Sequence, residues 1–253
     1  MMKNTAAKMT LLFLLLSTMC VAPLGCSEKS KEEQAAEELI DQIDEIGRQN
    51  REELQSELED DGGYSMRTER VDKLVDAYEN SSEDLPDALK AQMADQVEAL
   101  KDIKALAQPY ELAYNAFTEL GGLDPTTMTD EADIQKRINL VNTLIDENEK
   151  IDAGFPEILP RLGGDPAEIE QQLDLVKKIR QTDREMLPHM REVLVILKKH
   201  WAISEMGDDD MFYFGYDVPD EDIDLYNEHI ELMNVAALEQ ERLQRLQLQM
   251  MQP

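Results

Sequence analysis

The residues best suited to metal or acid–base chemistry are three histidines, His189, His200 and His229. His189 and His200 lie eleven residues apart on one expected helix, a spacing that places them on the same face. Glu185 and Glu192 flank His189 on that side. Imidazole with carboxylate can bind a transition metal or move a proton. His189 and Glu192 are therefore candidate metal ligands, and the alternative is a solvated helix face.

Patterns typical of common metalloenzymes and nucleotide enzymes are absent from the sequence. The residues three places before the histidines are Met186, Leu197 and Tyr226, so no Glu-x-x-His of a di-iron bundle occurs. The sequence also lacks a His-Glu-x-x-His helix, a phosphate loop, a nucleophile elbow and a G-x-G-x-x-G fingerprint. We therefore predict a non-enzymatic protein without a cofactor.

A second candidate is the acidic loop 208–224, within "GDDDMFYFGYDVPDEDID". Calcium prefers carboxylate and carbonyl oxygens. Counting an EF-hand from Asp210, however, puts Phe212 and Phe214 at ligand positions. Metal binding through irregularly spaced carboxylates of this loop remains an alternative.

Aromatic residues concentrate in the same loop, close to the chain's single tryptophan. Aromatic side chains inside an acidic rim are suited to binding a basic peptide or protein. The other interpretation is that two phenylalanines fill the hairpin core while the tyrosines reach a hydrogen-bond partner or solvent. The predicted partner-binding residues are Trp201, Phe212, Tyr213, Phe214 and Tyr216.

The N-terminus has the three parts of an export signal. Lys3 and Lys8 precede an apolar run over 10–16, and small residues follow in "VAPLGC". The apolar stretch is shorter than the roughly 20 residues of a membrane-spanning helix. We predict that residues 1–25 are a signal peptide.

The end of this leader resembles the lipobox of bacterial lipoproteins, in which a small residue precedes a cysteine that receives a diacylglyceryl group. Gly25 and Cys26 match it, whereas Pro23 stands where the pattern has Leu, Val or Ile. The resemblance implies lipidation of Cys26, a polar tether over 26–34, and anchoring at the outer membrane or cell surface. The alternative is an ordinary secretory signal and a soluble periplasmic protein.

Composition limits the chemistry further. Cys20 and Cys26 are the two cysteines, so an exported body in which Cys26 is lipidated has no thiol for a disulfide, a thiol nucleophile or a zinc–thiolate site. The net charge of −30 disfavours nucleic acid and anionic lipid headgroups as direct partners and permits cationic ones. Hydrophobic residues make up 42% of the chain and recur at helical spacing, which predicts a folded helical protein rather than disorder.

The elements that must position these residues are helices. We expect helices at 31–60, 66–79 and 220–250, and between them a threefold pattern of a long helix, a proline and a shorter helix. Because proline suits a first turn and disrupts a helix interior, each proline should open a new helix. The expected long helices are 86–107, 130–152 and 166–186, and the shorter ones open near Pro109, Pro156 and Pro188.

The predicted fold is all-α, with about eight helices in antiparallel hairpins, as a bundle or short α-solenoid. The expected sections are N-terminal helices over 35–80, a helical-hairpin domain over 84–204, and 205–253, with an irregular loop near 205–219 and a last helix. The segment "YELAYNAFTELGGLDP" (110–125) resembles the second helix of a tetratricopeptide repeat through Ala113, Phe117 and Pro125, although Leu120 stands where the family prefers alanine. The resemblance implies a protein-binding helical architecture and assigns no binding residues.

Together these features predict a lipid-anchored, exported, non-catalytic scaffold or adaptor at the bacterial envelope. Its expected partners are the membrane, through lipid on Cys26, and another envelope protein, with a homo-oligomer through the long helices as a further option. The alternative is a metal- or small-molecule-binding envelope protein that uses His189 and Glu192 or the acidic loop 208–224.

Overall fold

The computed structural model describes residues 31–61, 67–81, 85, 87–163, 166–207 and 211–250. Six α-helices dominate these residues, which confirms the all-α prediction and corrects the expected number of about eight. They are α1 (Lys31–Asp61), α2 (Glu69–Ser81), α3 (Asp87–Glu119), α4 (Glu131–Ile158), α5 (Pro166–His200) and α6 (Asp220–Met250). The smaller elements are the 3-10 turns η2 (Pro125–Thr127), η3 (Leu159–Leu162) and η4 (Trp201–Ile203), and the strands β1 (Glu205–Met206) and β2 (Phe212–Tyr213).

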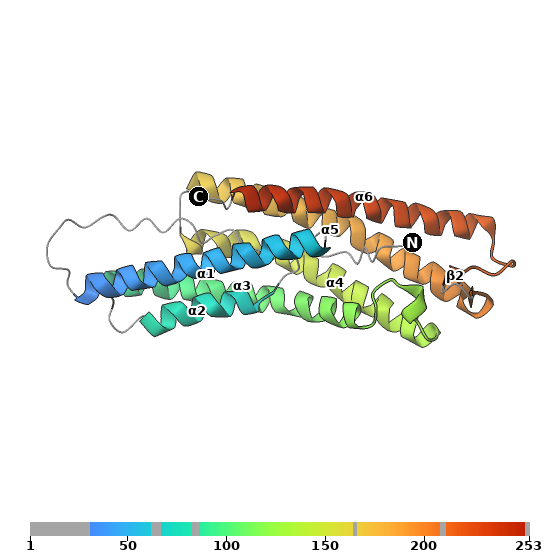
Figure 1. Cartoon of the computed structure of the whole chain (residues 1–253), viewed down its shortest axis with the longest axis horizontal. Helices are drawn as coiled ribbons and strands as arrows, with labels where there is room; N and C mark the ends of the chain where they lie inside the picture. Colours follow the sequence, from blue (N-terminus) through green and yellow to red (C-terminus); the bar gives the residue numbers. More distant parts are fainter. Residues whose placement is uncertain are drawn as a thin grey trace.

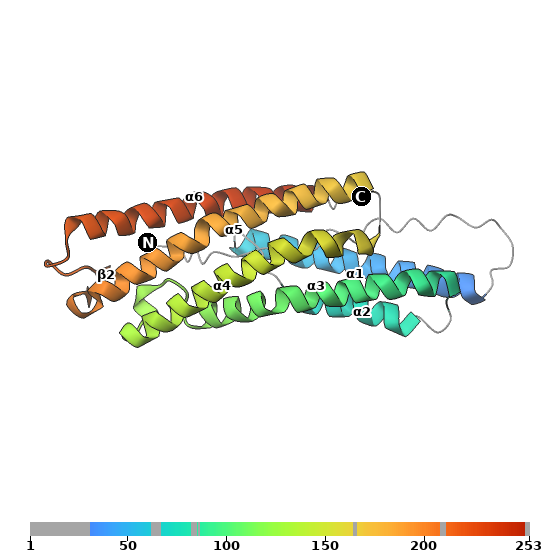
Figure 2. The same cartoon turned by 180° about the vertical axis from the view of Figure 1, so that it is seen from behind.

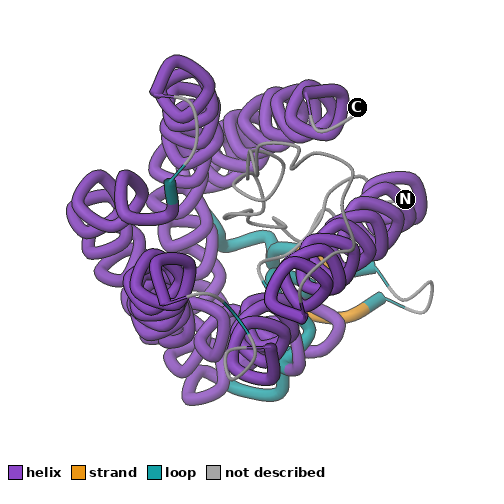
Figure 3. The backbone as a smooth tube through the Cα atoms, turned by 90° about the vertical axis from the view of Figure 1, so that its left-hand side faces the viewer, coloured by secondary structure: helices purple, strands orange, loops and turns teal. Residues whose placement is uncertain are grey.

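The helices lie along the long axis of an elongated bundle and reverse direction at each connection (Figure 1 and Figure 2). Each helix packs against the next in sequence, and α1 also contacts α6. Viewed along the bundle, the helices are arranged around its axis (Figure 3). The α3–α4 and α5–α6 connections lie at the same end (Figure 1).

Apolar stripes on the helices explain this arrangement. On α5, Met186, Met190, Val193 and Leu197 recur at spacings of four, three and four residues, and all are fully buried. Such a stripe covers one helix face and must pack against other helices to leave water. Buried residues from α1 through α6 form one continuous hydrophobic core.

The predicted role of the prolines is wrong. Pro109, Pro156 and Pro188 lie inside α3, α4 and α5, so each expected pair of helices is one continuous helix. All three are exposed. A proline on the solvent side loses one backbone hydrogen bond where water can satisfy the carbonyl, while packing holds the opposite face. The hairpins therefore form between successive long helices.

The remaining helices and the tether expected from the sequence can be compared with the described residues. Expected helices 31–60, 66–79 and 220–250 correspond to α1, α2 and α6, and the tetratricopeptide-like residues 110–119 form the end of α3. Residues 31–34 of the expected tether belong to α1. The leader, Cys26 and the rest of the tether lie outside the described residues. Among the helices described, none is long and apolar enough to cross a membrane.

Two successive glycines follow the end of α3. Gly121 and Gly122 have φ angles of 91° and 63°, in the left-handed region that favours glycine. The buried Arg137 guanidinium then fixes the turn by donating to the carbonyls of Gly122 (2.7 Å) and Thr127 (3.0 Å). Buried hydrogen bonds from Arg137 thus stabilise the α3–α4 connection.

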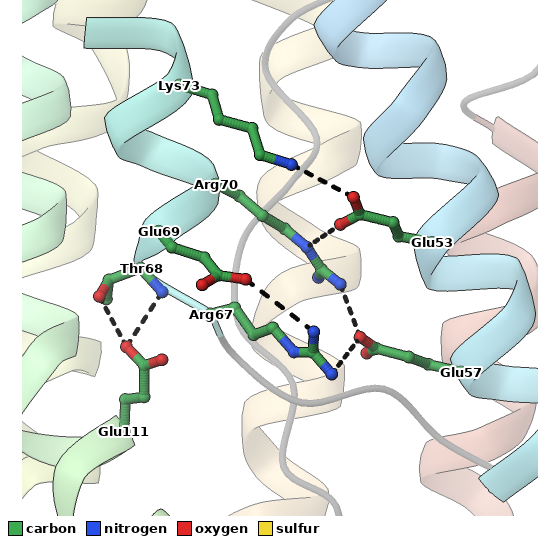
Figure 4. Close-up of polar contacts among 8 residues, drawn as sticks. All are labelled: Glu53, Glu57, Arg67, Thr68, Glu69, Arg70, Lys73 and Glu111. Carbon is green, nitrogen blue, oxygen red and sulfur yellow. Dashed lines mark hydrogen bonds and ion pairs between the residues drawn. The ribbon is translucent and has the colours of Figure 1, made fainter. Parts of the chain in front are cut away.

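A second group of polar contacts connects α1 and α2 with each other and with α3 (Figure 4). The Arg70 side chain on α2 is fully buried, and its NH2 group donates to the Glu57 carboxylate on α1 at 2.8 Å. Thr68 donates through its backbone N and its Oγ1 to the Glu111 carboxylate on α3, at 3.0 and 2.6 Å. These contacts pair every drawn cation with a carboxylate, as expected of a structural cluster.

Candidate functional site

Three of the five predicted partner-binding aromatics take part in packing. Trp201 stacks on Phe212 with ring centroids 5.8 Å apart, and Phe212 meets Phe214 edge-on at 5.3 Å. Phe214 in turn meets Tyr226 of α6 edge-on at 5.1 Å. This aromatic cluster, Trp201, Phe212, Phe214 and Tyr226, attaches the β1–β2 ribbon to the bundle. The core-filling interpretation accounts for these two phenylalanines.

The ribbon is held close to the preceding turn. Strands β1 and β2 pair antiparallel, with Glu205 opposite Tyr213 and Met206 opposite Phe212. Gly215 passes so near Ile203 that a Cβ atom at this position would lie 1.8 Å from the Ile203 carbonyl oxygen. Only glycine permits this approach, which directs the chain into α6.

The two tyrosines of the loop point outward, as the core-filling interpretation expected. Tyr216 is fully exposed and Tyr213 is about half exposed. Three other apolar side chains are exposed in the same connection. We call these five residues the tip: Ile203, Met206, Met211, Tyr213 and Tyr216.

Further exposed apolar side chains lie on α6, the helix that follows the tip in sequence. We call Leu225, Leu232, Val235 and Leu238 the α6 stripe, and their exposed fractions lie between 40% and 67%. The core face of α6 is separate, because Tyr226, Met233, Ala236 and Gln240 are buried. This stripe was not predicted from the sequence, where its signal is a second set of apolar residues beside the core-facing one.

The surroundings of the α6 stripe are acidic. Exposed carboxylates at Glu221, Asp224, Glu228 and Glu231 share the outer side of the helix. From residue 220 to residue 241, α6 contains no lysine or arginine. Apolar contact area and negative charge therefore coincide over these residues.

The expected joint face of His189 and His200 does not form one site, because each histidine pairs with α6 separately. His200 Nε2 lies 2.8 Å from Asp222 Oδ2, which also accepts from Lys199 Nζ at 2.7 Å. Hydrogen bonds lower the pKa of the Asp222 carboxyl, with the larger contribution from Lys199 and a smaller one from His200. This contact fixes the start of α6 against the end of α5.

His189 contacts the remaining histidine. Its Nδ1 lies 2.9 Å from Nδ1 of His229, with ring centroids 5.1 Å apart. Partial burial, followed by the neighbouring His229, lowers the pKa of His189. We call His189 and His229 the histidine pair. His229 is the residue of this pair that the sequence-based candidate lacked, since no spacing rule connects positions on different helices.

Glu192, the other predicted ligand, lies near the histidine pair and forms an ion pair with Arg191. The Glu192 carboxylate accepts from Arg191 NH2 at 2.7 Å. In the described part of the chain, no group of three or more His, Cys, Asp or Glu side chains is arranged to hold a metal ion. Residues 208–210 of the acidic loop lie outside that part.

A buried polar layer crosses the middle of the bundle. Asp183 of α5 is fully buried and accepts hydrogen bonds from Arg180 NH1 at 3.1 Å and from Gln240 Nε2 of α6. Arg180 also donates to the Asn148 carbonyl at 3.2 Å and lies over the Tyr110 ring. Burial raises the pKa of Asp183 to about 7, against the lowering effect of Arg180. The sequence signal was a charged pair at positions that continue the apolar stripe of α5.

Comparisons of the chain with protein-family models, curated proteins and solved structures found no match.

Proposed function

We propose that the protein is an exported, lipid-anchored, non-catalytic adaptor that binds a basic segment of another envelope protein along the tip and the α6 stripe. The observation that carries this proposal is the coincidence of an exposed apolar row with an acidic surface on α6. Isolated exposed leucines are common in soluble proteins and need no explanation. Four exposed apolar residues on one helix, which follows directly after a connection with exposed tyrosines, are a more specific feature.

The charges define the partner. A second copy of this chain would bring like charges together, which costs binding energy. A helix with Lys or Arg beside leucines would bury its apolar face on Leu232 and Val235 and pair its cations with Glu228 and Glu231. Helix-in-groove recognition commonly uses anchors at this spacing.

Anchoring supports the same role. Cys26 lies at the end of the leader, and two or three acyl chains there would hold the protein stably on a membrane, whereas one chain would not. A few residues after it, α1 begins at Lys31, so the bundle would stand close to the surface. An intact mass of the membrane-extracted protein, beside a Cys26→Ala variant, tests this part. A peptide mass without diacylglycerol would support the secreted, soluble alternative.

The binding surface is tested with a synthetic amphipathic Lys/Leu helix as the probe, measured by fluorescence anisotropy on the chain from residue 27 onward. A Leu232→Ser, Val235→Ser double variant should weaken binding by about tenfold or more, because apolar anchors dominate interface energies. Leu112→Ser is the control, since Leu112 is an exposed leucine on a different helix, α3. Equal loss in both variants, or equal binding of a Glu/Leu helix, would contradict the proposal.

The cellular counterpart uses photo-crosslinking from position 235, compared with position 112, in chains with and without Tyr216→Ala. We expect a discrete crosslink at position 235 that weakens with Tyr216→Ala. Identical products from both positions would show that α6 has no special role.

A different observation, the histidine pair, favours the second candidate function, binding of a metal ion.

A further inference from the structure

We propose that His189 and His229 form a two-histidine site for a divalent transition-metal ion, copper(II) or nickel(II), which bridges α5 and α6. The proposal is independent of the adaptor function. It rests on the placement of two imidazole Nδ1 atoms 2.9 Å apart on neighbouring helices.

The state of the pair suits metal binding. At this separation one proton lies between the two nitrogens, so one ring donates and the other accepts. Neutral imidazole is the form that binds metal. To bind one ion, the pair must release the shared proton, and the rings must turn until their lone pairs converge beside the N···N line.

The distance indicates which ions fit. Two nitrogens bound at about 2.05 Å to one ion are about 2.9 Å apart at a right angle, and about 3.3 Å apart at a tetrahedral angle. The observed 2.9 Å thus matches neighbouring positions of a tetragonal site, the geometry of copper(II) and nickel(II). Copper(II) also binds nitrogen ligands most tightly among these divalent ions.

The surroundings supply negative charge. Glu192 and Glu228 act electrostatically on His189, so both carboxylates lie near the pair. Glu192 is held by the adjacent Arg191 in a half-exposed ion pair, an interaction worth little free energy and readily exchanged for a cation. Water would complete the coordination, since the described residues offer no third ligand in place. A net charge of −30 raises the local concentration of cations.

The ion would connect the two helices that carry the tip. His189 lies eleven residues before the end of α5, and His229 lies nine residues after the start of α6. A bridge there would restrain the α5–α6 connection from its base.

The test uses the chain from residue 27 onward, which contains every described residue and no cysteine. After chelator treatment it is titrated with copper(II) and with nickel(II), followed by calorimetry and, for copper, by electron paramagnetic resonance. We expect one ion per chain and hyperfine coupling to two imidazole nitrogens. His229→Gln should weaken binding by about tenfold or more and remove one nitrogen from the spectrum.

His200→Gln is the matched control, because it removes the histidine outside the pair. It should retain the affinity and both nitrogen couplings. A rise in the melting temperature of the wild-type chain on adding one equivalent of copper(II) gives a readout that needs no variant. Copper bound equally by His229→Gln, bound with carboxylate oxygens in place of both nitrogens, or absent from the wild type would overturn the proposal.

Discussion

Asp183 shows how burial can outweigh an adjacent opposite charge. Its carboxyl lies 3.1 Å from Arg180, yet removal from water raises its pKa to about 7. Arg180 also forms an ion pair with a second carboxylate, because its Nε lies 3.5 Å from Asp152. The buried polar layer therefore contains a carboxyl that gains or loses its proton near neutral pH.

This pKa gives the stability of the bundle a definite pH dependence. Between the unfolded pKa of 3.8 and the folded value of about 7, the folded state holds a proton that the unfolded state has lost. The contribution of Asp183 is therefore fully present below pH 3.8 and is lost as the pH rises through 7, by up to about 1.4 kcal/mol per pH unit. Asp183→Asn should flatten this part of the profile.

The measurement is the free energy of unfolding in urea at several pH values between about 5 and 8. Asp146→Asn, at an exposed position on α4, should keep the wild-type slope. Parallel profiles for the wild type and Asp183→Asn would mean that this carboxyl is ionised throughout the range.

At the scale of elements, the long helices are the main departure from the sequence prediction. The rule that proline begins a helix describes local preference. In α3, α4 and α5 the apolar stripe continues on both sides of the proline, and tertiary packing then decides the outcome. The helices run the length of the bundle because their neighbours bury both halves.

Replacing the prolines by alanine should therefore stabilise the protein. Pro109→Ala, Pro156→Ala and Pro188→Ala each restore a backbone hydrogen bond inside a helix. Proline costs about 3 kcal/mol there relative to alanine, while the unfolded chain gains up to about 1 kcal/mol of conformational freedom. We expect a net gain on the order of 1 kcal/mol per site, measured by chemical denaturation.

Pro219→Ala is the control for this series, because Pro219 precedes α6 and its ring interrupts no helix. It should give no gain. Loss of stability in the three helix variants would mean that these prolines open helices after all.

On the scale of the whole molecule, charge opposes compactness. The net charge of −30 is spread over an elongated bundle whose surface ion pairs neutralise some of the carboxylates. Like charges destabilise the compact state. At physiological ionic strength, salt largely screens the repulsion between exposed charges that are more than about 8 Å apart. The same field would attract a cationic partner to the tip and the α6 stripe.

We therefore expect the melting temperature to rise as sodium chloride increases from about 0.01 M to physiological strength. Circular dichroism at a helix-sensitive wavelength measures it. A variant with Glu221, Asp224 and Glu228 changed to Gln should show a smaller rise. A melting temperature that falls with salt would mean that the ion pairs outweigh the repulsion.

The sequence by itself determined the helical class, the ends of several helices and the thiol chemistry that the chain after residue 26 lacks. Spacing of apolar residues sets α1 and α6, glycine sets the end of α3, and the positions of Cys20 and Cys26 leave the chain after residue 26 without a cysteine. These features follow from local rules that a single segment obeys.

Tertiary structure decided which residues meet. His189 contacts His229, and His200 contacts Asp222. Trp201, Phe212 and Phe214 pack against one another, whereas Tyr216 and the α6 stripe are exposed. Tertiary structure also carried three helices through their prolines. A helical period fixes the face on which a residue lies, but the partner across the bundle depends on how all six helices bury their stripes together.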